Sequence, residues 1–115
     1  ASMGSALAAG ADDLRAAMAL VLEQGSDPEH GPDAVQAYAT PLLNLAGHVL
    51  CAWQMGIAAL HAQQAVDGGS DEPFYRTKLC SAEFAIHQWL PVGRAQRAVI
   101  EAGWQCFSQF DSAAH

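Results

Sequence analysis

Residues 42–60 read LLNLAGHVLCAWQMGIAAL, and this stretch decides the fold class. Its apolar residues recur every three or four positions, which is the spacing of one face of an α-helix. The whole chain has 24 alanines and eleven β-branched residues, a balance that favours helices because alanine loses no side-chain entropy in them. We therefore predict an all-α protein whose longest helix contains this stretch. The face expected to be buried comprises Leu42, Leu45, Ala46, Val49, Ala52, Trp53, Gly56, Ile57 and Leu60.

Outward from this stretch, the same periodicity predicts helices at about 12–24, 34–66, 72–90 and 92–109. Glycine and proline between these segments supply the breaks, and Pro41 predicts a kink inside the second helix. The expected fold is an antiparallel up-and-down four-helix bundle. Its predicted core comprises Leu14, Met18, Leu45, Val49, Trp53, Ile57, Leu79, Ile86, Val99 and Cys106.

The 115 residues are enough for one compact domain and too few for two. We expect that domain to extend over residues 12–110, between tails at 1–11 and 111–115, with residues 1–5 resembling an expression scar. Two glycines inside the second helix, Gly47 and Gly56, predict a close approach by a neighbouring helix.

The charge balance bears on partners and location. Five Lys and Arg against twelve Asp and Glu give a net charge of −7, which excludes nucleic acid as an expected partner because phosphates require basic residues. Uninterrupted apolar runs fall far short of the roughly 20 residues that cross a bilayer. The start of the chain lacks the basic residues of a signal peptide. These features predict a soluble cytoplasmic protein without a transmembrane segment.

Residue types that carry chemistry are present, but their spacing does not form a recognised site. The cysteines form no Cys-x-x-Cys pair, and Glu83 and His87 are four residues apart rather than in the Glu-x-x-His spacing of di-metal bundles. A phosphotransfer histidine would precede Lys and Gly by three and four positions, which none of the internal histidines does. We therefore predict no catalytic, cofactor-binding or metal-binding residue. The residues considered are Cys51, Cys80, Cys106, His48, His61 and His87.

Two features of the last predicted helix concern binding. Arg94 and Arg97 lie three residues apart and are open to two interpretations, contact with an anionic group or a solvated face. Ile100, Trp104 and Phe107 belong to an apolar arc of roughly 160°, wider than the about 100° that a bundle core needs. They are the candidate interface, unless the first helix or the end of the chain covers them.

Residues 38–110 resemble a known domain in two stretches. The first, Tyr38 to Leu60, has an aromatic residue, paired leucines, glycine and tryptophan in family-like order. The second reads FYRTKLCSAEF at 74–84 and continues to Leu90 and Pro91. Both are similar to the C-terminal helical domain of bacterial acyl-CoA dehydrogenases, in the group of 3-methylmercaptopropionyl-CoA dehydrogenase-like enzymes.

The resemblance implies a parent flavoenzyme in which FAD accepts hydride during α,β-dehydrogenation of an acyl-CoA. It implies no catalytic residue here, because the family's catalytic glutamate and FAD-binding residues belong to preceding domains. The implied partner is the flavin-binding body of the parent chain. The apolar arc of the last predicted helix separately predicts a homo-oligomer, in which Trp104 is buried against a second copy. The alternatives are a stand-alone helical-bundle interaction module and, after it, a histidine phosphotransfer domain.

Overall fold

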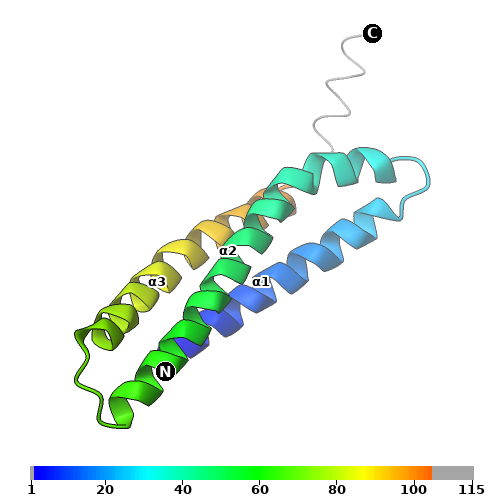
Figure 1. Ribbon diagram of the computed structural model, residues 1–115. Helices are drawn as coiled ribbons and strands as arrows, with labels where there is room; N and C mark the ends of the chain where they lie inside the picture. The colour runs from blue at the N-terminus through cyan, green and yellow to red at the C-terminus, as the bar shows by residue number, and fades with distance from the viewer. Residues whose placement is uncertain (1, 105–115) are drawn as a thin grey trace.

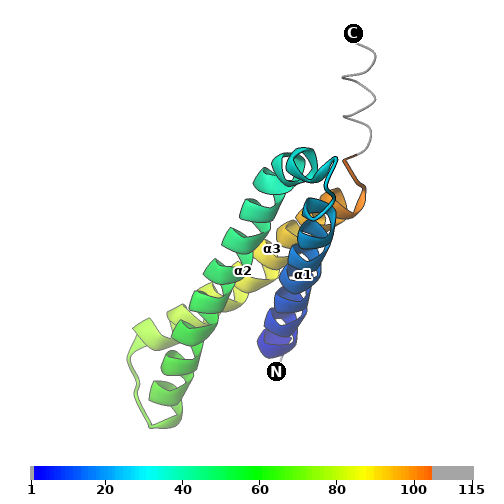
Figure 2. The same ribbon diagram turned by 90° about the vertical axis from the view of Figure 1, so that its right-hand side faces the viewer.

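The computed structural model describes residues 2–104, which consist of three helices joined by short connections. The helices are α1 (Ser2–Gly25), α2 (Gly31–Asp67) and α3 (Pro73–Glu101), which run antiparallel in chain order (Figure 1). Each helix packs against the other two. The turn between α2 and α3 extends beyond the start of α1, so this end of the bundle is only two helices wide (Figure 2). The all-α class is confirmed.

The third and fourth predicted helices are one helix, and the expected four-helix bundle is therefore not what the described residues form. Pro91 lies inside α3, where it has no N–H to donate and crowds the preceding turn. Leu90 immediately before it and Ile100 beyond it are buried. Packing on both sides of the proline outweighs the roughly 3 kcal/mol that an interior proline costs.

The other helix boundaries also differ from the expectation in part. α1 begins at Ser2 rather than near residue 12, so the expected N-terminal tail is helical from residue 2. α2 continues without interruption through Pro41, and the kink expected there stays a prediction. The first turn of α2 contains Pro32, and the proline is tolerated there because N–H groups in the first turn of a helix make no hydrogen bond within the helix.

The connection between α1 and α2 is tight because Asp27 and Gly31 organise it. Asp27 Oδ1 accepts hydrogen bonds from the backbone N–H groups of Glu29 at 2.9 Å and His30 at 3.3 Å. The Gly31 N–H donates to the Asp27 carbonyl at 2.9 Å. A Cβ at Gly31 would collide with the carbonyl oxygen of Gly25, so only glycine permits this close approach of the two helix ends.

Leucines packed onto glycines hold the three helices together. A Cβ at the glycine would lie 2.6 Å from the leucine in two of these pairs and 3.2 Å in the third, so the absence of a side chain makes room for the leucine. The close backbone approach expected at Gly56 is wrong in kind, because the neighbour there is the side chain of Leu7. The one expected at Gly47 is wrong altogether, because a Cβ there would meet nothing within 4 Å. The pairs are Gly10 with Leu90, Gly56 with Leu7, and Gly93 with Leu45.

The predicted core is correct along its centre and wrong along one side. Leu45, Val49 and Ile86 are buried, while Leu14 and Leu79 are partly buried. The remaining predicted core residues in the described part are at least 39% exposed. Each helix has only two neighbours in this three-helix arrangement, so part of its apolar face stays uncovered. These exposed residues are Met18, Trp53, Ile57 and Val99, and Cys106 lies outside the described residues.

The apolar character of α2 is high enough to satisfy a membrane criterion. Among the described helices, α2 alone is long and apolar enough to cross a bilayer, with a mean hydropathy of 1.3 over 18 residues. Core helices of soluble proteins meet the same criterion, and α2 packs against both other helices. This property therefore assigns no membrane span, and the expected absence of one stays a prediction.

Candidate functional site

The predicted interface residues lie inside the molecule. Ile100 is fully buried and Trp104 is 5% exposed. The indole Nε1–H of Trp104 donates to Gln24 Oε1 at 3.2 Å, and its ring centre lies 5.6 Å from that of His30. Gln24 at the end of α1 and His30 in the following connection thus cover Trp104. Since Ile100 is buried as well, these two side chains do not form the exposed patch that was expected. Phe107 lies outside the described residues.

Arg94 and Arg97 contact an anionic group, as one of the two interpretations of the sequence allowed, and that group is a carboxylate of their own chain. Asp13 of α1 is only 5% exposed and accepts from Arg94 Nε at 3.1 Å and from Arg97 Nη1 at 2.7 Å. Arg97 Nε donates in turn to Glu101 at 2.7 Å. Hydrogen bonds to Asp13 and then to Glu101 raise the pKa of Arg97 above its usual value.

This cluster joins α1 to α3 and is electrically balanced. Two arginines face two carboxylates, so no net positive charge remains to attract an anion. Asp13 lies four residues before the buried Ala17, on the same face of α1. This ion pair was not expected from the sequence; the signal that could have indicated it is a carboxylate on the buried face of a helix.

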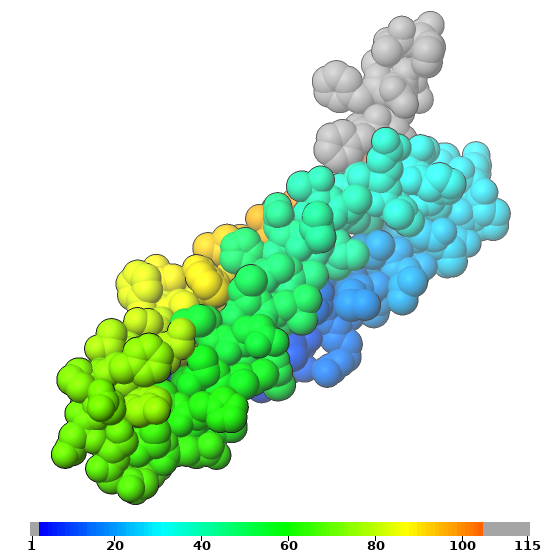
Figure 3. All heavy atoms as spheres, viewed as in Figure 1, coloured from blue at the N-terminus to red at the C-terminus, as the bar shows by residue number. Residues whose placement is uncertain are grey.

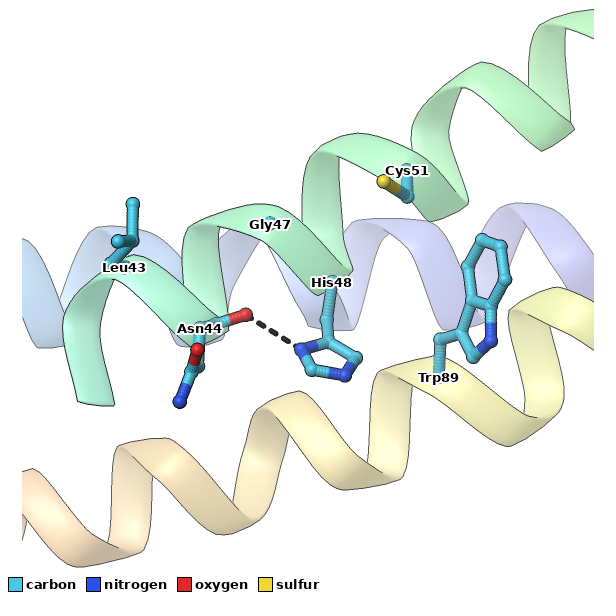
Figure 4. A pocket seen from close by; sticks show the side chains of 6 residues that line it. All are labelled: Leu43, Asn44, Gly47, His48, Cys51 and Trp89. Carbon is cyan, nitrogen blue, oxygen red and sulfur yellow. Dashed lines mark hydrogen bonds between the residues drawn. The ribbon is translucent and has the colours of Figure 1, made fainter. Parts of the chain in front are cut away.

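A hollow of about 280 Å³ lies between α2 and α3 (Figure 4). His48 Nδ1 lies 2.6 Å from the Asn44 carbonyl oxygen, and because a carbonyl only accepts, Nδ1 is the donor of this hydrogen bond. Trp89 rises from α3 toward Cys51, which follows His48 by one helical turn (Figure 4). No carboxylate is among the lining residues that the structure describes, so no acidic side chain orients the imidazole in this hollow.

A larger groove, of about 580 Å³, lies between α1 and α2. Its large side chains are Met18 and Leu22 of α1 and Leu50 and Trp53 of α2, which are 47%, 72%, 60% and 50% exposed. The groove is almost wholly apolar. Its one charged lining residue, Arg15, is bonded to Asp12 at 2.8 Å. Sequence reasoning missed this groove because it assigned Met18 and Trp53 to the core.

Within residues 2–104, no three metal-ligating side chains come together. Cys51 and Cys80 are exposed free thiols. The geometry of the described residues therefore offers surfaces for packing rather than a convergent set of catalytic groups.

Comparison with known proteins gives a consistent assignment. The family model described as "Acetyl-CoA dehydrogenase C-terminal like" matches residues 1–111. The 3-methylmercaptopropionyl-CoA dehydrogenase of Ruegeria pomeroyi is 34% identical over 98 residues, covering 84% of this chain and 15% of the relative. The chain thus corresponds to a small part of the length of this curated relative. No solved structure matches the chain significantly. Since the family model spans nearly all of its residues, the chain belongs to the acetyl-CoA dehydrogenase C-terminal-like family.

Proposed function

We propose that the chain is the non-catalytic C-terminal helical domain of an acyl-CoA dehydrogenase-like, FAD-dependent enzyme, in which it serves packing or subunit contact. The observation that carries the proposal is the coverage: the chain matches 15% of a relative named as an acyl-CoA-type dehydrogenase, over 84% of its own length. The parent enzyme is proposed to perform α,β-dehydrogenation of an acyl-CoA in the cytoplasm, and the domain to comprise residues 12–110.

The described side chains do not fit an FAD site, so FAD is assigned to the parent and no step is derived through it here. A bound dinucleotide needs cations or free backbone N–H groups at its phosphates. Of the five Lys and Arg, three are bonded to carboxylates of their own chain: Arg15, Arg94 and Arg97. The other two, Arg76 and Lys78, line neither the hollow between α2 and α3 nor the groove between α1 and α2. The groove between α1 and α2 is apolar, which suits protein packing better than a diphosphate.

The proposal is tested by comparing the 115-residue chain with the longer open reading frame that contains it. The longer protein should bind FAD and reduce an electron acceptor when an acyl-CoA is added. The 115-residue chain should do neither, as judged by flavin absorbance after dialysis and by the same assay. Stoichiometric FAD binding or acyl-CoA oxidation by the 115-residue chain would contradict the proposal.

The exposed groove also favours a second candidate, a stand-alone interaction module with the same helical fold. Large apolar patches on soluble proteins mark contact sites whether or not a flavin domain precedes them. The gene distinguishes the two: a frame that continues upstream into a flavin-binding dehydrogenase supports the first, and a ribosome-binding site with a start codon at Met3 supports the second.

A further inference from the structure

We draw no further inference here: the strongest candidate, the exposed apolar face that α1 and α2 present along the groove between them (Figure 3), carries nothing because nothing in the structure shows what covers it.

Discussion

The two sides of α1 are held to their neighbours by different means. On the side of α3, Asp13 accepts from two arginines and Gln24 accepts from Trp104, so directional hydrogen bonds determine how the helices align. On the side of α2, the groove beyond the buried Val49 is apolar and open. The contact between α1 and α3 thus has its polar groups paired within the chain. The contact between α1 and α2 leaves apolar surface exposed, which a further partner can cover.

The largest expected effect separates the two tryptophans. Trp104→Ala should lower the free energy of unfolding by about 3 kcal/mol, because it removes a buried ring and the bond to Gln24. Trp53→Ala should cost about 1 kcal/mol or less, since its side chain is half exposed. Urea unfolding of both variants measures these costs. Equal costs would contradict the contrast between the two sides.

A smaller effect is expected from the buried carboxylate of the α1–α3 contact. Asp13→Asn should lower the free energy of unfolding by about 2 kcal/mol, because both charge-assisted hydrogen bonds weaken. Asp12→Asn is the matched control, because Asp12 is the neighbouring residue and pairs with Arg15 at the surface, where the two side chains are 70% and 77% exposed. This substitution should change the free energy of unfolding by less than about 0.5 kcal/mol. Thermal unfolding at low and high salt would show whether the larger cost belongs to the buried pair.

Tyr38, which lies beside Trp104, makes the stability of the folded chain depend on pH in the alkaline range. Burial raises the pKa of Tyr38 above its usual 10.0, and a hydrogen bond from the Trp104 backbone partly offsets the shift. The folded state therefore keeps the phenolic proton to higher pH, so this stabilisation is complete below pH 10.0 and is lost as the pH rises through the raised pKa. Urea unfolding from about pH 8 to about pH 11 should show a loss of stability that Tyr38→Phe reduces. Tyr75→Phe, the control, should not reduce it.

The smallest effect is expected in the α1–α2 connection. Backbone N–H groups of Glu29 and His30 lower the pKa of Asp27 below its usual 3.8. The folded state therefore favours the carboxylate, and the stabilisation is present above pH 3.8 and lost as the pH falls through the lowered pKa. Asp27→Ala should lower the melting temperature slightly at neutral pH and not at about pH 2. Glu29→Ala, whose backbone still donates, should have no comparable effect at neutral pH.

Local pattern was sufficient for the class and for the centre of the core. Helix periodicity correctly placed Leu45, Val49 and Ile86 inside. It failed at Pro91, because the cost of an interior proline is local whereas the packing that offsets it comes from other helices. The exposure expected of Trp104 was wrong for a related reason, since its burial depends on Gln24 at the end of α1, 80 residues earlier in the chain.

The sequence by itself determined that this chain is helical, acidic and similar to a dehydrogenase C-terminal domain. Those properties follow from composition, residue spacing and motifs, which are local and need no partner. Only the tertiary structure decided which apolar residues are covered. α2 has apolar side chains over more of its circumference than α1 and α3 can contact, so the placement of these two helices leaves Trp53 exposed and Leu45 buried.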